Sequence, residues 1–395
     1  MPKQLKLLLV GMVINVVGSS FLWPLNAIYI HDVLGKSLTM AGIVLMLNSA
    51  AGVIGNLIGG HLFDRFGGYR SILIGVSTTM AAGIGLVWNH SWPWYVGFLI
   101  LMGFGSGMVF PSMYAMAGAV WPEGGRKPFN AMYVAQNVGV AVGAALGGLV
   151  ASVSFQLTFT ANAIMYGVFF LLAVLTYHKI QVEKIEQRSM LDGGKLIKNR
   201  AKFTSLLILC FGFLLCWVAH VQWQTNIASY TQSLNISLNQ YSLLWTVNGA
   251  LIVLAQPVIS TVIRFVAKTL KAQIIIGIII YMISFFVVAN TTVFTGFLVA
   301  MIILTIGEMF VWPAIPTVAN QLAPKGREGF YQGVVNSTAT GGRMLGPVLG
   351  GFMVDVYNIN ALFVLLIALL FMSIFTTLFY DRAIKKEQVN QELTA

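Results

Sequence analysis

Long apolar stretches separated by short polar segments recur along the whole chain of 395 residues. Each stretch reaches roughly 20 residues, the length that an α-helix needs to cross the hydrocarbon core of a bilayer. The strands of a membrane β-barrel are only about 10 residues long and alternate in polarity, so the pattern excludes a barrel. We predict an all-α polytopic membrane protein with twelve transmembrane helices. They are expected at 5–30, 39–63, 70–88, 93–120, 129–152, 155–178, 204–231, 240–264, 272–290, 293–321, 330–355 and 359–380.

The basic residues predict the orientation of these helices. The net charge is +11, and 21 of the 23 lysines and arginines fall in the termini or in loops that join an even-numbered helix to the next one. Lys36 lies in a loop on the opposite side, and Arg343 lies inside a span. Because basic loops stay in the cytoplasm, both termini are expected there. The positive charge therefore indicates topology and not a nucleic-acid surface, and we expect a monomer in the lipid bilayer of the plasma membrane.

The second half of the chain repeats the first. Trp23 recurs as Trp223, and Asn48 recurs as Asn248, in each case 200 positions later. Further on, GVAVGAALGG at 139–148 matches GRMLGPVLGG at an offset of 203. Such agreement predicts two six-helix pseudo-repeats in parallel orientation, with a site near the midplane between them.

These repeats define the expected domains. The N-terminal six-helix bundle covers 1–178 and the C-terminal bundle covers 204–395. The polar segment 179–203, which contains Gly-Gly, is expected to be a cytoplasmic linker.

Glycines at four-residue spacing mark the matched segments of the two repeats. They allow helix backbones to approach closely in lipid, where no hydrophobic force drives helices together. We predict helix-packing positions here, which can also act as a hinge. They are Gly139, Gly143, Gly147, Gly342, Gly346, Pro347 and Gly350.

Glu308 is the only ionisable residue between Lys271 and Lys325. A charged carboxylate in hydrocarbon costs several kcal/mol, so a glutamate here is expected to have a function. Glu308 lies roughly 21 Å from the cytoplasmic end of its helix, and Arg343 lies at a similar depth in the following one. Burial favours the neutral form of a carboxyl group and a nearby arginine favours its charged form, so Glu308 can act as a proton switch.

Two other interpretations of this pair remain open. Glu308 and Arg343 can form a permanent ion pair that only holds the second half together. Alternatively, Arg343 contacts an anionic substrate or a lipid phosphate. His220 is a third candidate for proton coupling, with hydrogen-bonded packing as its simpler role.

Polar and aromatic residues within the predicted spans are candidates for a substrate cavity. Several polar side chains on the helix at 204–231 cannot all face lipid, and aromatic rings offer a surface for an apolar or cationic ligand. Helix packing is the alternative role for most of the rings, Trp217 included. The candidates are Trp23, Asn26, Asn48, Phe110, Gln222, Trp223, Gln224, Asn226, Asn248, Phe310 and Trp312.

Some segments resemble a known family. GGHLFDRFGGYR at 59–70 resembles the loop 2–3 signature of the major facilitator superfamily, and the glycine segments resemble its antiporter motif. GEMFVWP, followed by APKGREGFYQG, is similar to helix 10 and loop 10–11 of multidrug–proton antiporters of the Gram-positive type. The resemblance implies drug binding and proton coupling at Glu308. The signature implies a cytoplasmic gate, in which Asp64 accepts hydrogen bonds from backbone N–H groups or a basic side chain; a solvated turn is the alternative. The gate residues are Gly60, Asp64, Arg65, Gly67 and Arg70.

No nucleotide-binding loop, hydrolase motif or paired cysteine framework occurs in the sequence. Cys210 and Cys216 are expected to be packing residues. We therefore predict a secondary active transporter and not an enzyme, with no cofactor and no metal, whose partners are a small-molecule substrate and protons. The leading hypothesis is multidrug efflux of lipophilic or cationic compounds by alternating access. A lipid or glycolipid flippase or exporter, a small-nutrient symporter and a non-transporting sensor are the alternatives.

Overall fold

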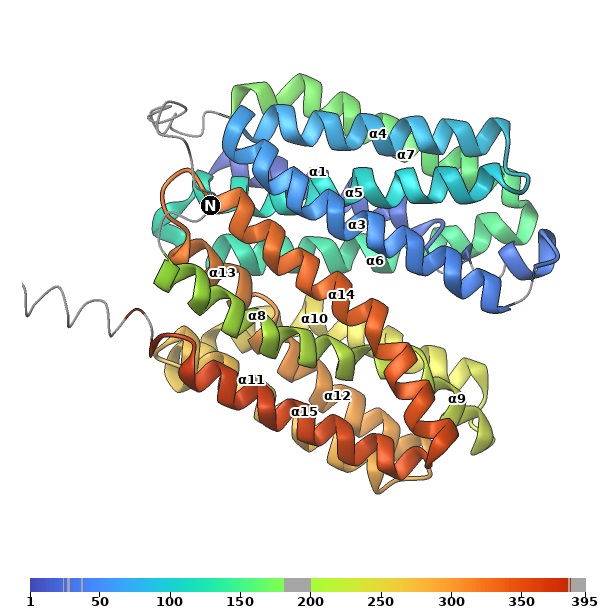
Figure 1. The fold of residues 1–395 in the computed structure, drawn as a ribbon, viewed down its shortest axis with the longest axis vertical. Helices are drawn as coiled ribbons and strands as arrows, with labels where there is room; N and C mark the ends of the chain where they lie inside the picture. The colour runs from blue at the N-terminus through green and yellow to red at the C-terminus, as the bar shows by residue number, and fades with distance from the viewer. Residues whose placement is uncertain (24, 27–28, 37, 181–199, 383, 385–395) are drawn as a thin grey trace, which may run out of the picture. The chain divides into compact units, whose positions relative to one another are not determined.

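The computed structural model describes residues 1–395 except 24, 27–28, 37, 181–199, 383 and 385–395. Every regular element in the described ranges is helical (Figure 1). The long helices are α1 (Lys3–Ser20), α3 (Leu38–Phe66), α4 (Gly68–Trp88), α5 (Trp94–Val120), α6 (Lys127–Val153), α7 (Phe155–Thr176), α8 (Arg200–Val221), α10 (Leu238–Val266), α11 (Leu270–Ala289), α12 (Phe294–Val311), α14 (Glu328–Val356) and α15 (Ile359–Phe379). The shorter ones are α9 (Asn226–Ser233), α13 (Ala314–Leu322), η1 (Tyr29–Val33), η2 (Pro122–Gly124), η3 (Tyr177–Lys179) and η4 (Gln222–Gln224).

The number of long apolar helices agrees with the predicted fold class. Among the described residues, 10 helical segments are long and apolar enough to cross a membrane. The other two long helices are α1 and α14, which contain Lys3, Lys6, Glu328 and Arg343. Together they account for the twelve expected spans, and the prediction of an all-α polytopic membrane protein is confirmed.

The internal contacts divide the chain into two compact units. Unit 1 comprises Met1–Asp192 with Lys325–Thr340, and unit 2 comprises Gly193–Pro324 with Gly341–Ala395. The units differ from the expected domains in one respect, because the beginning of α14 is grouped with the first bundle. Most of the expected linker, 179–203, lies outside the described residues.

Each unit pairs its helices in the same way. In unit 1, α5 packs against α3 and α4, while α7 packs against α4 and α1. In unit 2, α12 packs against α10 and α11, while α15 packs against α11 and α8. Figure 1 shows α11 and α15 running side by side. Long helices at the same positions in the order of each unit therefore pack together, as expected for a repeat.

The glycines spaced four residues apart lie at helix contacts that correspond between the two units. On α6, a Cβ atom at Gly143 would meet the Ser20 side chain and the Val17 backbone of α1 at 2.7 Å. On α14, a Cβ at Gly342 would meet Trp217, and one at Gly346 would meet Val221, both on α8. These glycines therefore permit a close approach of two helix backbones in each unit.

Replacing Gly143 with leucine should destabilise unit 1. The new side chain has no space against α1, and overpacking of a tight contact costs about 1–3 kcal/mol. We expect a lower melting temperature of the purified full-length protein. Gly167→Leu is the matched control, since nothing lies within 4 Å of a Cβ at Gly167. Equal melting temperatures for the two variants would contradict a packing role for Gly143.

Two helices predicted as continuous are interrupted at positions related by the repeat. The span predicted at 5–30 ends as an α-helix at Ser20, and the span predicted at 204–231 changes at Val221 to the 3₁₀ turn η4 before α9 begins. In the second case, the Gln222 side chain donates to the Gly346 carbonyl oxygen on α14. A third interruption separates α12 from α13 at Pro313, which has no N–H to continue the helix.

Both cysteines are buried in α8. Cys210 is 4% exposed and Cys216 is 1% exposed. The Cys216 Sγ lies 3.3 Å from the Ser373 Oγ of α15. The two thiols therefore occupy packing positions within unit 2.

Candidate functional site

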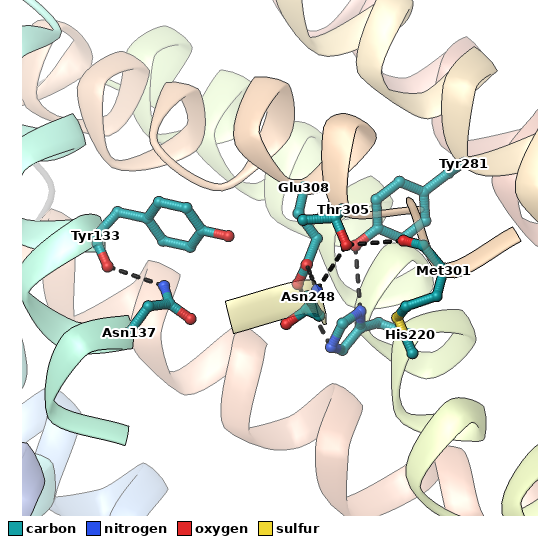
Figure 2. Close-up of polar contacts among 8 residues, drawn as sticks. All are labelled: Tyr133, Asn137, His220, Asn248, Tyr281, Met301, Thr305 and Glu308. Atoms are coloured by element: carbon teal, nitrogen blue, oxygen red, sulfur yellow. Dashed lines mark hydrogen bonds and ion pairs between the residues drawn. The ribbon is translucent and has the colours of Figure 1, made fainter. Parts of the chain in front are cut away.

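Glu308 is buried in unit 2, on the last turn of α12. The Asn248 Nδ2 atom, on α10, donates to its Oε2 at 2.7 Å and also contacts Thr305 Oγ1 at 2.9 Å (Figure 2). The His220 Nε2 atom, on α8, lies 3.6 Å from its Oε1. Three helices thus meet at one buried carboxyl group.

His220 connects this carboxyl group to a tyrosine. Its Nδ1 lies 3.2 Å from the Tyr281 hydroxyl of α11, and Figure 2 shows the imidazole between Tyr281 and Glu308. A neutral imidazole satisfies both neighbours when Nδ1 accepts from Tyr281 and the Nε2 proton faces Glu308. The arrangement therefore favours one tautomer of His220 and orients its N–H towards the carboxyl group.

An aromatic cluster adjoins His220 in unit 2. The Trp217 ring centroid lies 5.3 Å from that of His220 and 5.0 Å from that of Trp312. Trp312 is also stacked on Tyr281, with ring centroids 5.5 Å apart. Arg343, on α14, lies over Trp217 with its Cζ atom 4.8 Å from the ring centroid. The cluster thus combines ring faces, a buried carboxyl group and a cation.

The Glu308–Arg343 pair suggested by their similar depth stays a prediction, and each residue has another described contact. Among the described residues, the ion-pair contact of Glu308 is with His220. The cation–π contact of Arg343 is with the Trp217 ring. Glu308 thus lies beside His220, while Arg343 lies over Trp217, the ring next to His220.

Several other candidates in unit 2 lie in helix contacts. Gln222 is fully buried and bonds the Gly346 carbonyl oxygen, while Asn226 donates to Gln222 Oε1. Trp223 is fully buried, and Phe310 packs with Ile263 and Ala267. Gln224 is exposed. Most of these candidate cavity residues therefore lie in helix-packing contacts, the alternative role that the sequence left open.

The candidates in unit 1 are dispersed. Asn26 accepts a hydrogen bond from the Tyr95 hydroxyl at 2.9 Å, and Asn48 donates to the Leu99 carbonyl oxygen. Phe110 is partly buried against the core of unit 1, whereas Trp23 is 57% exposed. The described contacts of these side chains form no cluster comparable to the one around His220.

Asp64 lies near the end of α3 and contacts the beginning of α14, both within unit 1. Its Oδ1 accepts from the Gly329 N–H at 2.8 Å, and its Oδ2 accepts from the Phe330 N–H at 2.9 Å. A Cβ at Gly60 would collide with the Gly329 backbone, so glycine is needed where these helices approach. Asp64 thus caps α14 with bonds from two backbone N–H groups. Burial raises the pKa of the Asp64 carboxyl group to about 7, and these two N–H groups favour its charged form.

The rest of the signature surrounds this contact. Gly67 joins α3 to α4 with φ +84, a left-handed conformation that favours glycine. Arg65 and Arg70 are exposed, and Arg65 lies over the Phe66 ring at 5.1 Å. Asp64 and Gly60 therefore make the interhelical contacts, while the two arginines face outwards.

Sequence reasoning missed Tyr281 and Thr305. Tyr281 is the hydroxyl partner of His220, and Thr305 contacts Asn248. A polar hydroxyl in the apolar run IIIGIIIYMISFF was a usable signal for Tyr281. Thr305 precedes Glu308 by three residues on one helix, a spacing that places both side chains on one face.

Comparison with known proteins extends over nearly the whole chain. The family model of the Major Facilitator Superfamily matches residues 8–343 and 225–394. The chain is 60% identical over 385 residues to the uncharacterized MFS-type transporter YttB of Bacillus subtilis (strain 168), covering 98% of this chain and 97% of that protein.

More distant relatives carry descriptions of their activity. The Na(+), Li(+), K(+)/H(+) antiporter of Planococcus maritimus is 26% identical over 389 residues, covering 88% of each chain. The quinolone resistance protein NorA of Staphylococcus aureus (strain MRSA252) is 24% identical over 367 residues, covering 90% of this chain and 91% of that one. With the family model matching both halves and a relative of high identity over its full length, the chain belongs to the Major Facilitator Superfamily of membrane transporters.

Proposed function

We propose that this transporter exports lipophilic cations in exchange for protons, with Glu308 as the coupling residue. The observation that carries the proposal is a buried carboxyl group beside an aromatic cluster in unit 2. Ring faces attract weakly hydrated cations, and a carboxylate supplies the opposite charge. A cation and a proton then compete for one carboxyl group.

Competition of this kind produces exchange. A proton that neutralises Glu308 removes the attraction for the cation, and a bound cation favours the charged carboxylate. Asn248 donates to Oε2, so its side chain holds the carboxyl group in place for this competition. Glu308 contacts Asn248 and His220, and His220 in turn contacts Tyr281. Alternating access would expose this carboxyl group first to the acidic exterior and then to the cytoplasm.

The relatives support both parts of the proposal. NorA is described as a quinolone resistance protein, and the Planococcus protein is described as an antiporter of alkali cations and protons. The first description fits export of a drug-like compound, and the second fits exchange of a cation for protons. Their identities of 24% and 26% leave the cargo of the present chain to experiment.

Orientation and location form part of the same proposal. The distribution of basic residues supports cytoplasmic termini, and proton-driven export would require the protein to lie in the plasma membrane. A monomer is sufficient, since the clustered carboxyl group, imidazole and rings all belong to one chain. Asp64 would stabilise the cytoplasmic gate in one conformation through its contact with α14.

The direct test measures proton movement in proteoliposomes with an acidic lumen. Tetraphenylphosphonium added outside should raise the luminal pH faster in vesicles containing the full-length protein than in protein-free vesicles. The protein-free vesicles measure passive leakage of the probe. Equal rates in both preparations, or a response to an anionic probe only, would contradict export of cations.

A further inference from the structure

The aromatic cluster of unit 2 already holds a cation. The Arg343 Cζ atom lies 4.8 Å from the Trp217 ring centroid, well within the range of about 6 Å over which a ring face attracts a cation. Arg343 is exposed and Trp217 is partly exposed, whereas Trp312 and His220 are buried. The contact between Arg343 and Trp217 is therefore the accessible edge of the cluster.

A lipophilic cation entering the cluster would need the same ring face. From Trp217, the path to the carboxyl group is short, because His220 lies 5.3 Å from Trp217 between ring centroids and 3.6 Å from Glu308 between Nε2 and Oε1. Two like charges cannot share one ring face without repulsion. Arg343 and an incoming cation are thus alternative occupants of Trp217.

We infer that Arg343 is a tethered occupant of the cation site, and that a transported cation binds by displacing its guanidinium group from Trp217. This inference rests on the proposed function and narrows the substrate class. A guanidinium is planar and weakly hydrated, so an effective competitor must also be weakly hydrated and must bring apolar area to the rings. Quaternary ammonium and phosphonium ions meet this condition, whereas small, strongly hydrated ammonium ions do not.

The same exchange provides a release step. When the guanidinium returns to Trp217, it removes the surface on which the cation was bound. Arg343 would therefore lower the affinity of the site and assist release of the cargo.

The test is equilibrium binding of radiolabelled tetraphenylphosphonium to the purified full-length protein in detergent. Arg343→Gln should bind the probe between about twofold and thirtyfold more tightly than the native chain. Arg382→Gln is the matched control, since Arg382 also lies over a ring, 3.9 Å from the centroid of Phe379, but outside the cluster. We expect Arg382→Gln to bind like the native protein.

Two further variants separate occupancy of the ring from charge alone. Arg343→Lys keeps the charge but replaces the planar group by a strongly hydrated one, so its affinity should approach that of Arg343→Gln. Trp217→Leu should weaken binding, and in combination with Arg343→Gln it should remove the gain. Melting temperatures show whether each variant is folded.

The possible outcomes are distinct. Tighter binding by Arg343→Gln supports the inference, including the case in which only this variant binds detectably. Unchanged or weaker binding by a folded Arg343→Gln overturns the inference and leaves cation export intact. An Arg343→Lys variant that binds like the native chain shows that the charge acts without occupying the ring, which also overturns it. Absence of binding in both the native chain and Arg343→Gln overturns cation export together with the inference.

Discussion

Replacing Glu308 with glutamine should abolish proton movement driven by tetraphenylphosphonium. Glutamine has nearly the same shape and keeps an oxygen that can accept from Asn248 Nδ2, but it cannot gain or lose a proton. We expect the rate in proteoliposomes to fall by about tenfold or more, corresponding to at least about 1.4 kcal/mol. The same vesicle assay, with a pH-sensitive dye in the lumen, measures the effect.

A second glutamate provides the control for this substitution. Glu123 is exposed in η2, so Glu123→Gln makes the same chemical change away from the cluster and should exchange like the native chain. If folded Glu308→Gln exchanges protons at the native rate, Glu308 is only a structural partner of Asn248 and His220. Proton coupling would then have to be assigned to another group.

Replacing Asp64 with asparagine should loosen the beginning of α14. The carboxylate accepts from two backbone N–H groups, of Gly329 and Phe330, and a hydrogen bond to a charged group contributes about 1.5–3 kcal/mol. Asparagine retains one acceptor oxygen and directs an NH₂ group at the other N–H. We expect the amides of Gly329 and Phe330 to exchange with deuterium about tenfold faster or more. Hydrogen–deuterium exchange followed by mass spectrometry of peptides covering 325–340 measures this change.

The control for Asp64 lies at the other end of the same helix. Asp355 is exposed on the last turn of α14, so Asp355→Asn removes one carboxylate without touching the capped end. It should leave exchange at 325–340 unchanged. If Asp64→Asn also leaves this exchange unchanged, the contact does not hold the helix end, and a solvated turn becomes the better description of the signature.

The helices were predictable because the bilayer sets their length, but their interruptions were not. After Ser20 the sequence stays largely apolar, so hydropathy gives no sign that the α-helix stops there. After Val221 the sequence becomes polar, but polar residues in a span also fit a continuous helix that lines a cavity. At Gln222, the interruption coincides with a side-chain bond to α14, more than a hundred residues later in sequence. Contacts of that kind depend on which helices pack together, which a local pattern does not contain.

The candidate site was predictable in part for a similar reason. The isolated carboxyl group in an apolar helix marked Glu308, and the repeat drew attention to Asn248. Depth along a helix could be counted, which suggested Arg343 as the partner of Glu308. The direction in which each side chain points depends on helix rotation, and the structure places His220 beside Glu308 and Arg343 over Trp217.

The burial of Cys210 and Cys216 has a practical consequence for experiments on conformational change. A water-soluble thiol reagent reaches neither side chain while α8 stays packed, so the native chain serves as its own unreactive background. A single cysteine introduced at an exposed position can then carry a spin label or a dye without removal of the natural pair. Distances between two such labels would follow the transport cycle in a protein whose helix contacts are otherwise unaltered.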